Sequence, residues 1–196
     1  MRQVFFDVET KDTFDDVGGY FPDRLHPSFI GVCVREGYEG RGEMIEIWEQ
    51  DLSKLWKIFE SADVIVGFNS IGFDMEVMRP LYPGNVDDLP QLDLMLQFKE
   101  ATGHRISLES IAQETLGRGK TGHGLDAIKY YKTGQLKELA SYCLMDVELT
   151  RDLYDVGRTK GKLSFMNKWN RRIETAIDFS FKPKKFPGTQ MTLLGI

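Results

Sequence analysis

The sequence predicts an α/β fold in which a mixed β-sheet is flanked by helices. Three apolar stretches in the first 48 residues have the character of β-strands, and helical patterns then alternate with further short apolar runs. The chain has 196 residues, of which 41% are hydrophobic and 12% aromatic. A chain of this length and composition can bury one sizeable core, which favours a single main domain.

The predicted strands are rich in β-branched and aromatic residues. They cover residues 3–8, 29–34, 44–48 and 64–68. The predicted helices carry apolar residues at a spacing of three or four. They cover residues 52–59, 73–81, 108–116 and 136–156. Ser107 is a good N-cap for the third of these helices, and Gly117 is a good residue to end it.

The pattern changes after Gly157. Residues 163–165 and 173–179 alternate between apolar and polar side chains, which predicts a β-hairpin appended to the main sheet. The last stretch, "FKPKKFPGTQMTLLGI", contains two prolines and predicts an extended tail. We therefore expect a main domain over residues 1–157 and a C-terminal hairpin and tail over residues 158–196.

The net charge of -5 is unevenly distributed. Residues 158–196 carry nine Lys and Arg against two acids, whereas residues 1–157 carry 16 against 28. An acidic body with a basic end is compatible with a polyanionic partner that approaches from one side. Charge alone fits a solvated basic face equally well.

Composition also narrows the setting of the protein. The chain has no apolar run long enough to span a bilayer and no signal-peptide pattern at its start, so we expect no membrane association. Its two cysteines lie far apart and it has only three histidines, which argues against a zinc site or a disulfide framework. A reducing cytoplasmic location fits this composition.

The first predicted strand carries two acids, Asp7 and Glu9, within "VFFDVETKD". Residues two apart on a strand point to the same face and lie roughly 6.6 Å apart along it. Burying two carboxylates side by side is unfavourable unless a cation lies between them, and Mg²⁺ and Mn²⁺ prefer such oxygen ligands. With 30 acids in the chain, this motif alone favours a solvent-exposed strand end.

Two later motifs bring further acids. "NSIGFD" places Asp74 at the start of a helix directly after a strand, and "YCLMD" places Tyr142 and Asp146 one turn apart on one face of the longest helix. Taken singly, Asp74 fits a helix N-terminal charge, and Tyr142 with Asp146 fits a surface pair. The order of the three motifs is what carries the interpretation.

D-x-E, then N-x-x-x-F-D, then Y-x-x-x-D resembles the DEDD exonucleases of the ribonuclease H-like superfamily, in their tyrosine-bearing DEDDy branch. The segment "SLESIAQETLGRGK" is similar to a stretch in the exonuclease domains of family-B DNA polymerases. The likeness covers residues 3–157. It implies a ribonuclease H-like sheet and a 3′–5′ exonuclease that hydrolyses terminal phosphodiester bonds of single-stranded or frayed DNA and releases nucleoside 5′-monophosphates.

The resemblance also implies roles for the residues. Asp7, Glu9, Asp74 and Asp146 would hold two divalent ions, Mg²⁺ or Mn²⁺, and Tyr142 would orient the attacking water. A pair of such ions stabilises the entering and leaving oxygens of an in-line displacement. A tyrosine with its usual pKa of ~10 is a poor base at neutral pH, so Tyr142 is expected to act by hydrogen bonding.

Three neighbouring residues are further candidates for substrate binding. Asn69 and Phe73 match family positions around the second motif, and Thr10 follows Glu9. Asn69 is expected to fix its loop or contact the terminal nucleotide, and Thr10 to offer its backbone N–H to the 3′ end. Local capping explains Thr10 and Asn69 equally well, and core packing is the favoured explanation for Phe73.

Nucleic acid is the expected partner, with bound metals and the basic C-terminal segment attracting its phosphates. The segment "QMTLL" at Gln190–Leu194 resembles the short peptide that docks on the bacterial sliding clamp, although an apolar tail folding onto its own domain is the favoured explanation. Two other functions stay open: a structure-specific or RNA-directed nuclease on the same fold, and a nucleic-acid-binding accessory subunit whose site is retired.

Overall fold

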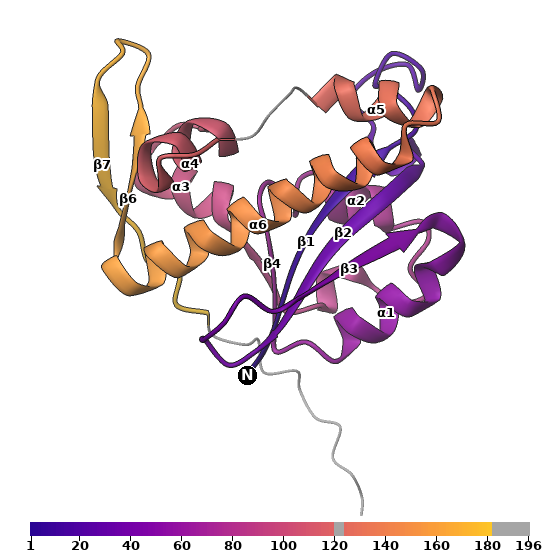
Figure 1. The fold of residues 1–196 in the computed structure, drawn as a ribbon, viewed down its shortest axis with the longest axis horizontal. Coiled ribbons are helices and arrows are strands. Elements are labelled where there is room, and N and C mark those ends of the chain that lie inside the picture. The colour runs from indigo at the N-terminus through magenta and orange to yellow at the C-terminus, as the bar shows by residue number, and fades with distance from the viewer. Residues whose placement is uncertain (120–123, 182–196) are drawn as a thin grey trace, which may run out of the picture.

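The sheet at the centre of the molecule has the order β3-β2-β1-β4-β5 (Figure 1). A computed structural model describes residues 1–119 and 124–181. The strands of this sheet are β1 (Arg2–Thr10), β2 (Pro27–Glu36), β3 (Glu43–Trp48), β4 (Val64–Gly67) and β5 (Gln91–Asp93). β1, β2 and β3 pair antiparallel, while β4 and β5 join them in parallel. The sheet is therefore mixed, as the sequence predicts.

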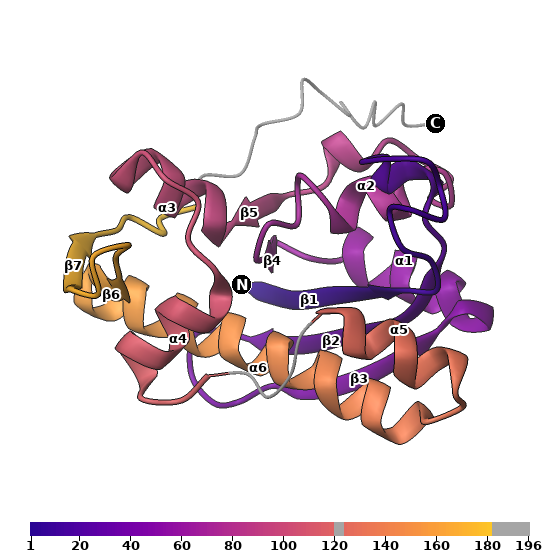
Figure 2. The same cartoon turned by 90° about the horizontal axis from the view of Figure 1, so that it is seen from above.

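Helices cover both faces of the sheet (Figure 2). They are α1 (Leu52–Glu60), α2 (Asp74–Met78), α3 (Leu94–Thr102), α4 (Leu108–Leu116), α5 (Gly124–Lys132) and α6 (Leu136–Lys160). Phe5 of β1 belongs to a core cluster with α3, α4 and α6, whereas Val4, Phe6 and Val8 belong to a second cluster with α1 and α2. The alternation of side chains along β1 thus fills two cores, one on each face.

Most of the predicted elements are confirmed to within two residues, and α4 matches its predicted bounds. α2 is shorter than the predicted 73–81, and α6 extends to Lys160. β5, α3 and α5 were not predicted. α3 begins directly after β5, where Asp93 caps the helix by accepting from the backbone N–H groups of Met95 and Leu96. Within the described residues, no helix has the length and apolar content needed to cross a membrane.

The predicted C-terminal hairpin is present as β6 (Lys162–Met166) and β7 (Arg172–Ala176), but it is not appended to the main sheet. These strands pair only with each other, as a separate two-stranded sheet. The hairpin packs on α4, where the Thr115 hydroxyl donates to Ser164 O and accepts from Ser164 N. The tail, including Gln190–Leu194, lies outside the described residues, and the division at residue 157 stays a prediction.

Candidate active site

A cavity of about 400 Å³ opens where β1 runs past the end of β4. β1 pairs with β4 only from Gln3 to Phe5, so the rest of β1 has no strand on that side. The gap lies at the carboxyl ends of two parallel strands, where α/β sheets commonly bind ligands. All eight residues selected from the sequence line this cavity. They are Asp7, Glu9, Thr10, Asn69, Phe73, Asp74, Tyr142 and Asp146.

Asp7 and Glu9 point from β1 toward α6, on the same face as Phe5. Asp7 lies opposite Gly31 in the β1–β2 ladder. A Cβ at Gly31 would come within 3.0 Å of Val147 Cγ2 and 3.1 Å of Cys143 Sγ, both on α6. The missing side chain at position 31 therefore lets α6 approach the strand that carries the two acids.

Tyr142 and Asp146 face the cavity from α6, and both are buried. Cys143 follows Tyr142 in the sequence and contacts two strands of the sheet. Its Sγ accepts from Gly31 N of β2 at 3.2 Å and lies 3.4 Å from Asp7 O of β1. Burial raises the pKa of the Cys143 thiol well above its ordinary value, and the nearby charges of Asp7 and Glu9 raise it further. Cys143 is thus a neutral thiol that anchors α6 beside Asp7.

Asp74 reaches the cavity from the first turn of α2. Its Oδ1 accepts from the backbone N–H of Val8 at 2.9 Å, a donor that is available because β4 has already ended there. Burial raises the pKa of the Asp74 carboxyl well above its ordinary value of 3.8, and the charge of Asp7 raises it further. Asp7 and Asp74 therefore repel each other across the cavity.

This donor set fits divalent cations. Four carboxylates from β1, α2 and α6 line one cavity, and ligand atoms of Asp7, Glu9 and Cys143 lie within 4.8 Å of one another. Carboxylate oxygens are hard ligands that suit Mg²⁺ and Mn²⁺, and the protonated thiol of Cys143 adds no soft ligand. Burial is the main cause of the raised pKa of Asp74, and repulsion by Asp7 adds to it; a bound cation would relieve that repulsion.

The predicted substrate-binding residues have different surroundings. Asn69 adopts a left-handed conformation with φ of 65°, and its Oδ1 accepts from Arg105 Nη2 at 2.7 Å. Phe73 packs edge-on against Phe14 with ring centroids 6.0 Å apart, in agreement with core packing. The Thr10 hydroxyl donates to Asp12 O at 2.9 Å, as a local cap would. All three nevertheless line the cavity.

Sequence reasoning missed Asp93, which shapes the loop that holds Asn69. Asp93 Oδ1 accepts from Asn69 N at 2.9 Å, and Oδ2 accepts from Ile71 N at 3.0 Å. Burial raises the pKa of Asp93, and its four backbone hydrogen bonds oppose that rise. A helix N-cap directly after a short strand was the available signal, since it places a carboxylate at the edge of the sheet.

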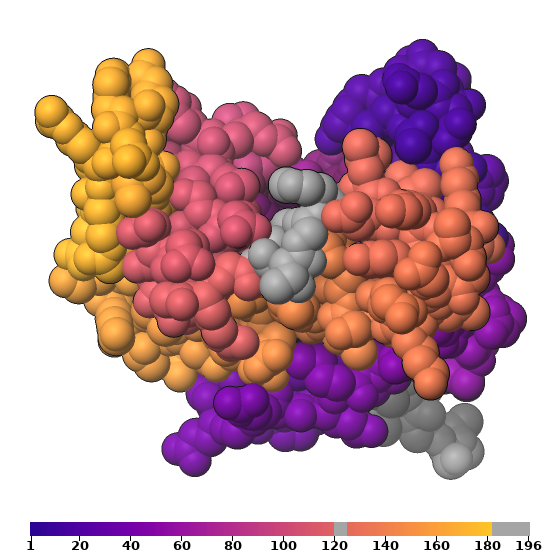
Figure 3. Space-filling model, turned by 45° about the horizontal axis from the view of Figure 1, so that its top comes forward, coloured from indigo at the N-terminus to yellow at the C-terminus, as the bar shows by residue number. Residues whose placement is uncertain are grey.

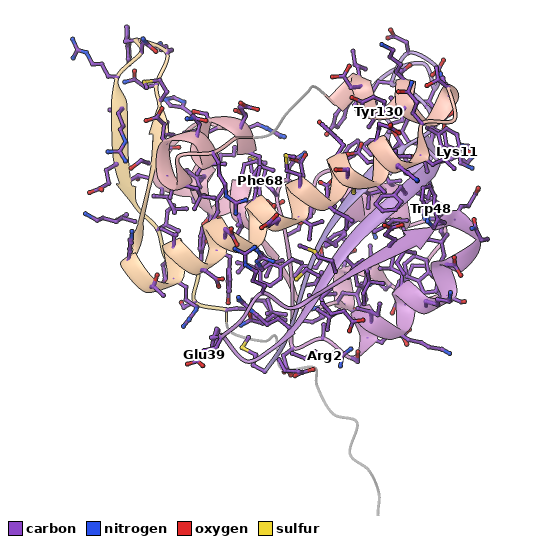
Figure 4. The ribbon with its side chains drawn as sticks, viewed as in Figure 1. Arg2, Lys11, Glu39, Trp48, Phe68 and Tyr130 are labelled. Carbon is purple, nitrogen blue, oxygen red and sulfur yellow. The ribbon has the colours of Figure 1, made fainter. Side chains whose placement is uncertain are left out.

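Arg105 was also missed, and it lies beside a second hollow of about 350 Å³. This second hollow shares Asp7, Phe68, Asn69 and Asp146 with the site cavity. Phe68 lies centrally in the molecule, away from Arg2 and Glu39 (Figure 4). The surface is notched between the α3–α4 region and the loop after β1 (Figure 3). Asp7 and Asp146 thus lie where the two hollows meet, whereas Glu9 and Asp74 line the site cavity alone.

The raised pKa of Asp74 gives a prediction about stability in the absence of metal. A carboxyl whose folded pKa exceeds its unfolded pKa stabilises the fold fully below the unfolded value, and this contribution is lost as pH rises through the folded value. The free energy of unfolding should therefore fall less with rising pH in Asp74→Asn than in the wild type. Denaturation monitored by circular dichroism at several pH values measures this difference. If Asp74→Asn kept the full wild-type pH profile, the raised pKa of Asp74 would be contradicted.

A model of the RNase H superfamily matches residues 4–157. The five-stranded mixed sheet with helices on both faces is the fold expected of this superfamily. The chain belongs to the RNase H superfamily. A search of curated proteins finds no match.

Among solved structures, the family B DNA polymerase of the archaeon Pyrobaculum calidifontis is similar over 81% of this chain and 24% of its own, with a TM-score of 0.58 and 18% identity. E. coli exonuclease I in complex with a 5cy-dT13 oligonucleotide has a TM-score of 0.49 and 14% identity, over 81% of this chain and 40% of its own. Exonuclease I of Methylocaldum szegediense has a TM-score of 0.48 and 17% identity, over 81% of this chain and 40% of its own. The chain thus spans less than half of each of these proteins, and the likeness to the polymerase establishes the fold.

Proposed function

We propose that this protein is a two-metal-ion 3′–5′ exonuclease that hydrolyses terminal phosphodiester bonds of single-stranded or frayed DNA and releases nucleoside 5′-monophosphates. The observation that carries the proposal is the meeting of four carboxylates and one tyrosine at a single cavity. They come from three segments of the chain that lie far apart in the sequence. A binding module has no need for so repulsive a cluster, which argues against a retired site.

Asp7, Glu9, Asp74 and Asp146 are the residues that would hold Mg²⁺ or Mn²⁺. Two such ions would lower the pKa of water and stabilise charge on the entering and leaving oxygens. Tyr142 lines the same cavity and can orient the attacking water through its hydroxyl. Asn69, held by Asp93 and Arg105, and Thr10 can contact the terminal nucleotide. No step requires a covalent bond to the protein.

The shape of the site supports action on a strand end. The carboxylates that line the cavity are buried or half-buried, so a base-paired end would have to open before its phosphate could reach them. Apolar side chains of Phe14, Leu25 and Phe73 line the cavity and offer surface to an unpaired base. A DNA strand with a single-stranded 3′ end is therefore the proposed substrate.

Degradation of a labelled single strand tests this function. With Mn²⁺, the wild-type protein should shorten a 5′-labelled DNA strand from its 3′ end and should stall when that end is blocked. Internal cutting of the blocked strand would favour a structure-specific nuclease, and preference for the matching RNA would favour an RNA-directed one. A shift in mobility without cleavage would favour the accessory subunit.

Tyr142→Phe tests the water-orienting role. Loss of one positioned hydrogen bond should lower kcat about 10- to 100-fold. KM should change little, and added Mn²⁺ should raise the melting temperature of the variant and of the wild type alike, because the carboxylates are intact. Steady-state kinetics on the same strand provide the measurement. A variant as active as the wild type would remove Tyr142 from the reaction.

A further inference from the structure

The loop that joins β6 to β7 is ordered by its own hydrogen bonds. Asn167 Oδ1 accepts from the backbone N–H of both Trp169 and Arg171 at 3.0 Å. Asn167 N donates to Arg171 O, and Asn170 adopts a left-handed conformation with φ of 57°. These hydrogen bonds order the backbone of the loop that carries Trp169.

Trp169 is 69% exposed, an unusual position for the largest apolar side chain. Lys168 Nζ lies 4.5 Å from its ring centroid. Elsewhere on the hairpin the cations are paired, Lys162 with Glu174 and Arg172 with Glu114. Within the described residues, Lys168 and Arg171 form no ion pair with a carboxylate. The hairpin tip, residues 167–171, thus presents one exposed aromatic ring and two cations that no carboxylate pairs.

The hairpin stands on the outer side of α4, and its tip lies near the N-terminal end of that helix (Figure 1). Met166 N donates to Ser110 Oγ near the start of α4, whereas Ser164 bonds Thr115 near its end. The strand therefore leads toward the N-terminal end of α4. That same end, with Arg105 and Ser107, lines the second hollow beside Asp7 and Asp146. Figure 1 shows α3 and α4 between the hairpin and the centre of the molecule, so a strand that joins the tip to the site would pass the N-terminal end of α4.

We infer that the hairpin tip binds the single-stranded part of a nucleic acid whose 3′ end occupies the carboxylate site. Trp169 stacks on a base, and Lys168 and Arg171 contact phosphates, with Arg105 lying between the tip and the site. An exposed ring flanked by unpaired cations matches the chemistry of a single strand, which offers bases and phosphates together. The inference rests on the proposed function and names the surface that holds the upstream strand.

Binding measured without cleavage tests this surface. In an Asp7→Asn background, the affinity for fluorescein-labelled oligothymidylate of 15 nucleotides should fall about tenfold on Trp169→Ala, from the loss of one stacked base. The affinity for a trinucleotide, which is too short to reach the tip from the site, should not change. Addition of the 15-mer should quench tryptophan fluorescence in the parent and much less in Trp169→Ala.

A double variant, Lys168→Gln with Arg171→Gln, tests the phosphate contacts. Two lost contacts should reduce the slope of log affinity against log salt by about 1.4 for a single strand.

Tyr38→Ala is the matched control for Trp169→Ala, because Tyr38 is also an exposed aromatic ring with a cation over it, Arg158 at 3.8 Å. Tyr38→Ala should bind the 15-mer as the parent does.

Three results would overturn the inference. The first is unchanged affinity of Trp169→Ala for the 15-mer. The second is equally tight binding of a blunt duplex that does not depend on Trp169. The third is a loss of self-association in Trp169→Ala by sedimentation, which would make the tip a protein contact. Cleavage of the same 15-mer by the wild-type protein reports separately on the proposed function.

Discussion

Asp7→Asn is expected to lower nuclease activity about a thousandfold or more, equivalent to about 4 kcal/mol of lost transition-state stabilisation. Asp7 interacts with two of the other acids: its charge adds to the burial that raises the pKa of Asp74, and its ligand atoms lie within 4.8 Å of those of Glu9. An amide keeps the size of the side chain but removes the charge that a divalent cation needs. Initial rates on a 5′-labelled strand with Mn²⁺ measure the loss.

The fold should survive this substitution. Because Asp7 repels Asp74, Asp7→Asn should match or exceed the thermal stability of the wild type without metal. Asp15→Asn is a matched control, since Asp15 is exposed in the loop after β1 and does not line the cavity. It should retain full activity. Comparable activity in Asp7→Asn and Asp15→Asn would contradict the assignment of Asp7.

Asp155→Ala is expected to destabilise the protein by about 3 kcal/mol, because it leaves a buried cation without its partner. The side chain of Arg35 is 2% exposed and forms two hydrogen bonds of 2.7 Å with Asp155 on α6. Arg35 Nη2 also donates to Gln3 Oε1 at 2.6 Å, so the pair ties β1 and β2 to α6. Urea denaturation monitored by circular dichroism measures the loss.

Two controls separate the buried charge from other effects. Adding Arg35→Met to Asp155→Ala should restore most of the lost stability, because the uncompensated charge is gone. Glu36→Ala breaks the exposed pair between Arg2 and Glu36 and should change stability by no more than about 0.5 kcal/mol. If Asp155→Ala cost no more than Glu36→Ala, the Arg35 pair would not be what holds α6 to the sheet.

The carboxylates could be identified from the sequence because local patterns determine their placement. An alternating strand fixes that Asp7 and Glu9 share a face, and a spacing of four fixes that Tyr142 and Asp146 share a helix face. The order of the motifs then indicated that they meet. The structure places all of them around one cavity, but their catalytic roles stay predictions.

The remaining features depend on contacts between distant segments. The hairpin was expected to join the main sheet, but alternation predicts only that a segment is a strand and not which strand it pairs with. In the structure, Ser164 of the hairpin instead forms a hydrogen bond with Thr115 of α4. Arg105 carries no local signal, because its role appears only through its contact with Asn69. The need for glycine at position 31 likewise comes from the close approach of α6, which lies more than a hundred residues away in the sequence.

Location of bound metal tests the central claim most directly. Crystals soaked in Mn²⁺ should show anomalous scattering from manganese at the cavity, with oxygens of Asp7, Glu9, Asp74 and Asp146 as ligands. The same soak of Asp7→Asn crystals should show weak or no signal there. Manganese bound elsewhere with the four carboxylates free of it, or an undiminished signal in Asp7→Asn, would contradict the account.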